Sequence, residues 1–426
     1  MHRFVRPTRR VNVGSLSVIA VVGLVGACAI AGTPQAATPE LRTLDLGGYS
    51  GRPLAAPPNA GETYGRLMES ARMADAVVSP RDIDPALSRI SAIPVPTPEE
   101  VVGILADATV QTLVAHGMLA GFSIGGTDDP TGMPVIDASG MPATGPARSV
   151  RLTVLRMRDN MTAMDAARAI DSRDFAVNRD NVDIPFPDYF ATHGHWRSYV
   201  PTMAATLAHG PFVVSLFITY PTSDRAAMET LVEKTFDAEL PRLDAFAPTP
   251  DDQLVALPMD PDAMLSRLLP TEPGQWPNPR LAHDEQQPIA GWGGHRSASG
   301  VVYGPVVADT WVNRPGDSER IPVESVAITD SARLLRFPDA VAARRALRRL
   351  SQPDATHTVA TAPSGVPDAV CLRNTDANPA ARDSEYSCLV LDGRYLALIT
   401  ASTEADAHHR ASAQYALLVT DRQAHG

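Results

Sequence analysis

The chain has 426 residues, of which 44% are hydrophobic, and a formal net charge of −11. This length and hydrophobic fraction are typical of a globular protein with two or three domains. The acidic balance excludes nucleic acid and anionic lipid as partners bound through charge alone.

The first 27 residues have the pattern of a secretory signal. Four arginines precede an apolar stretch, residues 11–26, which at sixteen residues is shorter than the ~20 needed to span a bilayer. The small pair Gly26-Ala27 then precedes Cys28, as at a bacterial lipoprotein cut site. We predict that residues 1–27 are removed and that Cys28 carries diacylglyceryl and further acyl chains such as palmitate. A plain cleaved signal and an uncleaved anchor are the alternatives.

The predicted anchor indicates where the protein acts. Two or three acyl chains hold a protein durably on a membrane, whereas a single chain binds weakly. We therefore expect the mature chain to be lipid-anchored at the extracytoplasmic face of the cell membrane. Without the four arginines of residues 1–27, 33 basic residues remain against 48 acidic ones, a net charge of −15. The lipid, and not charge, must then provide the attachment.

A proline-rich segment, residues 28–63, follows the predicted cut site and is typical of a tether. Its leucines between Leu41 and Tyr49 favour packing of that part on the folded body. A first helix is expected from Tyr64 to Ala76.

A longer helix is expected from Pro98 to about His116. Thr97 suits its N-cap, Glu100 completes a capping box, and Gly117 suits a left-handed C-cap. Apolar residues cover most of the circumference, which predicts a helix buried between layers.

The rest of the chain shows a duplicated order of strand, helix, hairpin and helix. Asp159 and Asp339 stand at the N-cap of the first helix of each copy. His209-Gly210 and Asp392-Gly393 stand at the hairpin turns. The first copy comprises a strand at 150–157, a helix at 163–170, hairpin strands at 203–207 and 212–220, and a helix at 224–240. The second comprises a strand at 334–337, a helix at 340–350, hairpin strands at 387–391 and 394–400, and a helix at 404–418.

This order predicts an α+β fold with two similar lobes, each a small antiparallel sheet with helices against one face. The first lobe is expected over residues 64–246 and the second over 283–426. The segment between them, 247–282, is proline-rich and is expected to form a connection with one short helix at 261–269.

The two remaining cysteines, Cys371 and Cys388, predict one disulfide, because the chain is expected outside the cytoplasm. It would close a loop of about 18 residues, worth roughly 3 kcal/mol in the chain-entropy treatment. The alternative is a pair of buried free thiols.

Several short segments together resemble a known family. They are Gly65–Glu69, Arg72–Asp75, Asp84-Pro85, the strand entry 208–214 and the late cysteine pair. These segments resemble a family of actinobacterial exported lipoproteins that is classed as a domain of unknown function, over about residues 40 to 420. The resemblance implies an envelope location and a two-lobed fold, and it provides no catalytic residue.

One serine stands in a catalytic pattern. Gly121–Gly125 has the G-x-S-x-G spacing of a serine hydrolase, with Ser123 as the nucleophile. The preceding helix is expected to end at Gly117, which leaves about four residues for a strand, and 127–130 is typical of a turn instead of a helix. The surroundings therefore favour a glycine-flanked strand or loop.

Two histidines and two aspartates lie within thirteen residues. His193, His195, Asp183 and Asp188 suit a divalent metal. The intervening glycine and prolines favour a polar surface loop or a contact between lobes, so neither a metal site nor a cofactor is predicted.

Two further segments have two interpretations each. Gly291–His295 with Tyr303-Gly304 is rich in glycine and aromatic residues, as in the wall of a ligand cleft or in a crowded loop. An arginine run predicts either phosphate or sulfate binding or a solvated helix face: Arg344, Arg345, Arg348 and Arg349.

No catalytic set emerges from these patterns. We therefore expect a non-catalytic envelope lipoprotein that binds a ligand or partner, since two similar lobes create a junction and junctions favour binding. The alternatives are a secreted serine hydrolase using Ser123 and a structural assembly protein of the envelope.

Overall fold

The computed structural model describes residues 40–59, 61–136, 141–142, 145–284, 295–376 and 384–425. The predicted signal and Cys28 lie outside these residues, as do 28–39 of the predicted tether and 291–294 of the glycine-aromatic segment. None of the helices in the described ranges combines the length and hydrophobicity that a membrane span requires.

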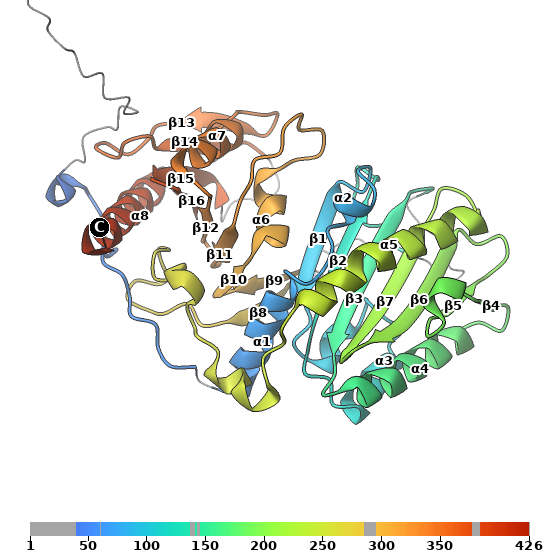
Figure 1. Ribbon diagram of the computed structural model, residues 1–426. Helices are drawn as coiled ribbons and strands as arrows, with labels where there is room; N and C mark the ends of the chain where they lie inside the picture. Colours follow the sequence, from blue (N-terminus) through green and yellow to red (C-terminus); the bar gives the residue numbers. More distant parts are fainter. Residues whose placement is uncertain are drawn as a thin grey trace, which may run out of the picture. The chain divides into compact units, whose positions relative to one another are not determined.

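Two seven-stranded antiparallel sheets form the centres of the two lobes (Figure 1). The first has the order β1-β2-β3-β7-β6-β5-β4 and the second β10-β11-β12-β16-β15-β14-β13. Counted from the first strand of each sheet, the two orders are identical. The first sheet contains β1 (Arg89–Pro94), β2 (Ala120–Thr127), β3 (Ser149–Arg156), β4 (Val182–Ile184), β5 (His193–Trp196), β6 (Thr202–His209) and β7 (Phe212–Thr219). The second contains β10 (Val301–Tyr303), β11 (Ser325–Ile328), β12 (Ala332–Arg336), β13 (His357–Ala360), β14 (Val370–Asn374), β15 (Tyr386–Asp392) and β16 (Tyr395–Ala401).

The helices repeat as well, which confirms the predicted α+β duplication. In chain order, equivalent helices follow the first, third and seventh strands of each sheet. The pairs are α3 (Thr109–Ala115) and α6 (Pro305–Val312), α4 (Asn160–Ala176) and α7 (Ala340–Leu350), and α5 (Arg225–Ala245) and α8 (Glu404–His425). The two aspartate N-caps are confirmed. Asp159 accepts a hydrogen bond from the Thr162 amide and Asp339 from the Ala342 amide, both at 2.8 Å.

Helices cover both faces of the first sheet, whereas the sequence predicted one face. Leu155 and Val213 pack in one core with α4, and their neighbours Val154 and Val214 pack in another with α5. Successive residues of a strand point to opposite faces, and the central strands are apolar at nearly every position, so both faces need cover.

The two lobes share one continuous apolar core. It runs from the α5 face of the first sheet to β10, α6 and α7 of the second lobe. Helix α1 (Glu62–Met73) contacts both β2 and β10 (Figure 1). The rings of Phe122 and Tyr303 meet edge to face across the junction, 6.3 Å apart. An apolar contact of this kind holds the lobes together more firmly than a polar domain interface would.

The predicted helix from Pro98 to His116 is wrong over its middle. The structure has a 3₁₀ turn, η2 (Pro98–Val101), and then the short α3. Gly103 between them has φ +76°, which interrupts a right-handed helix, and Thr97 makes no side-chain cap. The predicted left-handed cap is confirmed, with φ +63° at Gly117.

The connection differs from its prediction in a similar way. It contains the 3₁₀ turns η4 (Asp251–Ala256) and η5 (Pro261–Ala263) in place of a helix over 261–269. Asp262 and Ala263 have positive φ values of 56° and 54°. The leucines that suggested a helical face, Leu265, Leu268 and Leu269, are instead buried in the core of α8.

Residues 40–59 lie against the folded body, as predicted for Leu41 to Tyr49. Leu44 is buried in the α8 core, and the Tyr49 hydroxyl donates to Asp406 at 2.8 Å. Farther along, Asn59 donates to the carbonyls of Leu254 and Leu257 in the connection. This part of the predicted tether therefore packs on both the second lobe and the connection.

The predicted disulfide between Cys371 and Cys388 is confirmed. The two residues are directly opposite each other on β14 and β15, with Cα atoms 4.1 Å apart. The bond therefore joins neighbouring strands inside the second sheet, where both cysteines are buried.

Elements outside the repeat complete the described fold. The helix α2 (Pro80–Ile83) precedes the first sheet. A two-stranded sheet of β8 (Arg280–Asp284) and β9 (His295–Ser299) precedes the second. Short 3₁₀ turns occur at η1 (Leu41–Thr43) and η3 (Pro187–Tyr189).

Candidate ligand-binding site between the lobes

A cavity of about 300 Å³ opens where α1, the connection and β10 meet. Each of the three segments contributes apolar side chains to its wall: Met68 and Ala71 from α1, Leu257 and Met259 from the connection, and Val301 and Tyr303 from β10. Its position at the junction and its apolar wall are typical of a small-molecule site.

Helix α1 is positioned by close contacts with both neighbouring segments. A Cβ atom on Gly65 would lie 2.3 Å from the Leu254 carbonyl oxygen, so only glycine allows this approach to the connection. Arg66 donates to the carbonyl of Met118 at 2.7 Å, just before β2. Residues of the segments that resemble the family, Gly65–Glu69 and Arg72–Asp75, thus position α1 between the first sheet and the connection.

Glu69 is the buried anchor of α1. Its carboxylate has no solvent exposure and accepts hydrogen bonds from Arg156 at 2.9 Å and from the Thr249 amide at 2.9 Å. It also pairs with Arg72. Two arginines and a backbone donor satisfy this buried charge, which would otherwise be strongly unfavourable.

In each lobe an arginine at the equivalent strand end forms an ion pair with the connection. Arg156 ends β3 and pairs with Asp251 at 3.1 Å, and Arg336 ends β12 and pairs with Asp262 at 2.9 Å. Arg336 also pairs with Glu324 at 3.0 Å. The duplicated arginines therefore fix both ends of the segment that forms one wall of the cavity.

Asp75 is the acidic residue of the cavity wall whose carboxyl group is available to a ligand. Its side chain is exposed in terms of surface area. It lines the cavity wall, however, so the surrounding protein still removes part of the water around its carboxyl group. Burial raises the pKa of Asp75 to about 6, against the opposing effect of Arg72 and Arg242. A Cβ atom on Gly304 would lie 2.1 Å from its Oδ1, so glycine at 304 makes room for this carboxyl.

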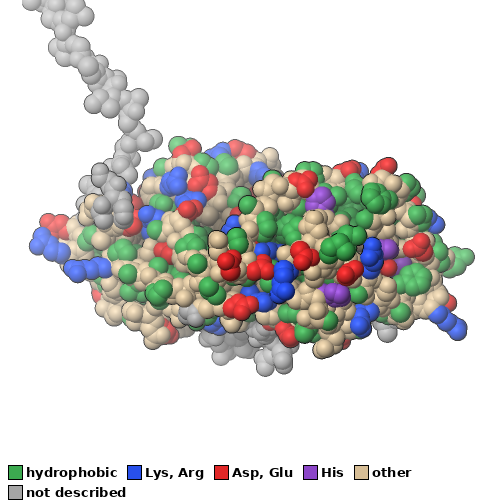
Figure 2. All heavy atoms as spheres, turned by 60° about the horizontal axis from the view of Figure 1, so that its bottom comes forward, with side chains coloured by type: hydrophobic (Ala, Val, Ile, Leu, Met, Phe, Trp, Pro, Cys, Tyr) green, Lys and Arg blue, Asp and Glu red, His purple; other side chains and the backbone are tan. Residues whose placement is uncertain are grey.

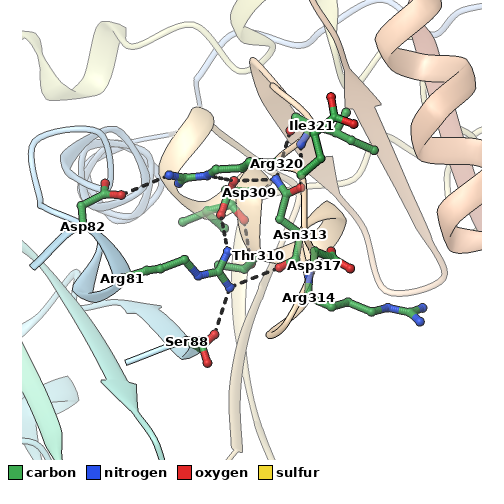
Figure 3. Close-up of polar contacts among 12 residues, drawn as sticks. Arg81, Asp82, Ser88, Asp309, Thr310, Asn313, Arg314, Asp317, Arg320 and Ile321 are labelled. Carbon is green, nitrogen blue, oxygen red and sulfur yellow. Dashed lines mark hydrogen bonds and ion pairs between the residues drawn. The ribbon is translucent and has the colours of Figure 1, made fainter. Parts of the chain in front are cut away.

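Polar contacts hold the lobes together at a second place (Figure 3). Asp309 of α6 is buried and accepts hydrogen bonds from Arg81 at 3.2 Å and from Arg320 at 2.8 Å. Arg320 also donates to Asp82 of α2 at 3.1 Å. Asn313 donates to the same Asp309 carboxylate at 2.6 Å. Arginines from both lobes thus share one buried acid, which fixes the lobes on either side of the apolar core.

The serine hydrolase interpretation of Ser123 is wrong. Ser123 lies inside β2 with no solvent exposure, and its hydroxyl is 2.8 Å from that of Thr153. A nucleophile must reach its substrate from an exposed turn between a strand and a helix. Here the pattern is an ordinary strand of an antiparallel sheet.

The histidines of β5 lie near two acids of α4 that the sequence did not suggest. His195 lies 3.6 Å from Asp171 and 3.5 Å from Asp174, both on α4. Of the two aspartates that the sequence suggested, Asp183 lies directly opposite His195 on β4, and Asp188 lies in η3. No three acidic, histidine or cysteine side chains of the described residues are arranged to hold a metal ion.

The arginine run of α7 forms ion pairs within the protein. Arg345 pairs with Glu319, Arg349 with Asp317 at 3.0 Å, and Arg344 with Asp368 at 3.1 Å. Two of the four residues thus hold the segment that follows α6. Figure 2 likewise shows acidic and basic side chains interspersed over the middle of one face of the molecule.

The glycine-aromatic segment is only partly described. Tyr303 and Gly304 line the junction cavity, as the cleft interpretation predicted, whereas 291–294 lie outside the described residues. Sequence reasoning missed Asp75 and the buried Glu69. The available signal was the spacing of three on a helix between Glu69, Arg72 and Asp75, which places them on one side.

Comparisons with known proteins identify a family and little else. No curated protein matches the chain. Among solved structures, the extracellular domain of PknH from Mycobacterium tuberculosis is similar at a TM-score of 0.25 and 10% identity, over 44% of this chain and 98% of that one. A likeness this low supports no inference about the present chain.

The family matches follow the two lobes. Residues 56–259 match the family described as Domain of unknown function (DUF7373) N-terminal, and residues 264–421 match its C-terminal counterpart. The boundary falls at η5, inside the connection. The chain therefore belongs to the DUF7373 family.

Proposed function

We propose that this protein is a non-catalytic lipoprotein of the cell envelope that binds a small ligand between its lobes. The observation that carries the proposal is the cavity of about 300 Å³ with the open carboxyl of Asp75 in a mainly apolar wall. A well-formed apolar pocket with few polar groups, one of them with a perturbed pKa, is the preferred candidate for a binding site.

The polar groups of the wall indicate the chemistry of the ligand. Arg336 is paired with Asp262 and Glu324, and Arg72 with Glu69. The side chain of Asp75 has no hydrogen bond or ion pair with a described residue. The expected ligand therefore has an apolar body and a hydroxyl or ammonium group that donates to Asp75.

Binding of simple probes tests this assignment. Hexylamine and hexanol are expected to bind the full-length protein, and hexanoate is not, in ligand-observed NMR. Affinity for hexylamine should increase as the pH rises through 6, because Asp75 ionises there. Asp75→Asn should weaken hexylamine binding about tenfold and remove this pH dependence.

The control for this test is Asp180→Asn, a change of the same kind on an exposed side chain of the first lobe. It should leave binding unchanged. Failure of both hexylamine and hexanol to bind, or equal affinity in Asp75→Asn, would contradict ligand binding at the junction and favour a structural role.

The membrane anchor is the second part of the proposal, and it depends on Cys28. The buried disulfide supports a compartment outside the cytoplasm, since such bonds persist where conditions are oxidising. Mass spectrometry of native protein is expected to show Cys28 as an acylated first residue. Cys28→Ser should lose both the acylation and the association with membranes. An intact, unmodified N-terminus in native material would rule out the anchor.

A further inference from the structure

A second cavity, of about 260 Å³, lies within the second lobe and is independent of the junction. Helix α7 has 11 residues, whereas the equivalent α4 has 17. The six missing residues correspond to about 9 Å of helix. Beyond Leu350 the face of the second sheet is therefore left uncovered, and the cavity opens there.

The floor of this cavity is mainly apolar, and Arg333, His357 and Ser387 are the polar residues that the strands contribute to it. Four leucines from four neighbouring strands line it: Leu335, Leu372, Leu389 and Leu398. Arg333 of β12 lies directly opposite Leu398 of β16, which in turn lies opposite Leu389 of β15. The guanidinium thus rises from the same row of the sheet as the leucines.

Arg333 is a partly buried cation without a counter-charge. Its guanidinium lies over the ring of Trp311, 4.2 Å from the centroid. Within the described residues its side chain has no ion pair, and its Nε is buried without a hydrogen-bond partner. Burial lowers the pKa of Arg333, but an arginine remains charged at neutral pH. An unpaired charge in such surroundings is unfavourable unless an anion joins it.

The other polar groups of the cavity do not supply that anion. Asp354 is the one carboxylate in its wall, and it is bonded to the Thr356 amide at 2.8 Å and to His357 at 2.9 Å. Arg314 adds a second positive charge. The charge of the wall is therefore positive around Arg333.

The first lobe has a comparable arginine two residues earlier on the equivalent strand, and there its charge is compensated. Arg151 rises from β3 on the equivalent face, over the ring of Phe217 at 5.2 Å. Asp174 lies close enough to act on the charge of Arg151. Asp174 belongs to the last six residues of α4, which α7 lacks. The shorter helix in the second lobe thus removes both the cover and the counter-charge.

We infer that the cavity around Arg333 binds a small organic anion. A carboxylate or phosphate group pairs with Arg333, with Arg314 near, and an apolar body lies on the leucine floor beside Trp311. The ligand class is distinct from that of the junction cavity, whose open polar group is an acid.

Titration calorimetry of the full-length protein with matched probes tests this inference. Benzoate, phenyl phosphate or both are expected to bind, and benzyl alcohol and benzylamine should bind at least tenfold more weakly. A preference between the two anions identifies the head group. Arg333→Met should weaken anion binding at least tenfold, and the matched change in the first lobe, Arg151→Met, should leave it unchanged.

Thermal unfolding distinguishes a binding role from a structural one. Arg333→Met should keep or raise the Tm, because no acidic partner loses its counter-charge. Arg151→Met should lower the Tm, because the largely buried Asp174 then keeps only His195 as a nearby positive partner. Absence of anion binding, equal affinity in Arg333→Met, or a fall in Tm matching that of Arg151→Met would overturn the inference. If Arg333→Met does not fold, equal binding of the anions and benzyl alcohol to the unaltered protein would overturn it.

Discussion

Replacing Glu69 by alanine is expected to lower the free energy of unfolding by about 3–5 kcal/mol. The change removes the acceptor of Arg156, whose side chain is only 5% exposed, and leaves that arginine's charge buried with one partner fewer. It also removes the acceptor of the Thr249 amide in the connection. Urea unfolding followed by circular dichroism measures the loss.

Glu62→Ala on the same helix is the matched control. Glu62 is 61% exposed and pairs with Arg66 four residues away, so the expected cost is about 0.5 kcal/mol or less. The double variant Glu69→Leu with Arg156→Met should lose less stability than the sum of the two single changes, because it removes both charges of the buried pair together. Equal losses for Glu69→Ala and Glu62→Ala would contradict the role of Glu69 as the anchor of α1.

Stability is expected to fall as the pH rises towards 8, because of Glu239. This carboxyl of α5 has no solvent exposure and accepts a hydrogen bond from the Val78 amide at 2.7 Å. Burial raises the pKa of Glu239 from 4.5 to about 8. Between these values the folded protein holds a proton that the unfolded chain has lost. The contribution is therefore complete below about 4.5 and is lost as the pH rises through about 8.

Glu239→Gln is expected to remove this dependence. The glutamine oxygen still accepts from Val78, and its amide has no charge to desolvate. The slope due to Glu239 is at most about 1.4 kcal/mol per pH unit, and it should vanish in urea unfolding measured at several pH values. Glu233→Gln on the same helix should keep the slope. An unchanged slope in Glu239→Gln would show that this carboxyl is not the cause.

Some parts of the fold follow from short-range patterns in the sequence. The aspartate caps at 159 and 339 determine where helices begin, and the glycines at 210 and 393 determine where the hairpins turn. The turns comprise residues 210–211 and 393–394, one residue later than the sequence indicated. These signals act over a few residues, so they survive whatever packs around them. Their repetition was enough to predict two lobes of the same construction.

Other parts depend on neighbours that lie far away in the chain. The apolar residues of 98–116 suggested one helix, but Gly103 interrupts it and Val114 remains 51% exposed. The leucines of 265–269 suggested another, but they are buried by α8, which lies about 150 residues later in the chain. Apolar spacing shows that a segment is buried, and it does not show against what.

The sequence by itself determined the duplicated α+β plan, the helix caps and the pairing of Cys371 with Cys388, because each depends on local geometry or on a count of partners. Only the tertiary structure decided which charged side chains line a cavity without an ion-pair partner. Asp75 and Arg333 look like ordinary surface residues in the sequence, and a neighbouring lobe in one case and a shortened helix in the other place them in cavities. The free energy of a charge depends on the solvent and counter-charges around it, and these are set by segments distant in the chain.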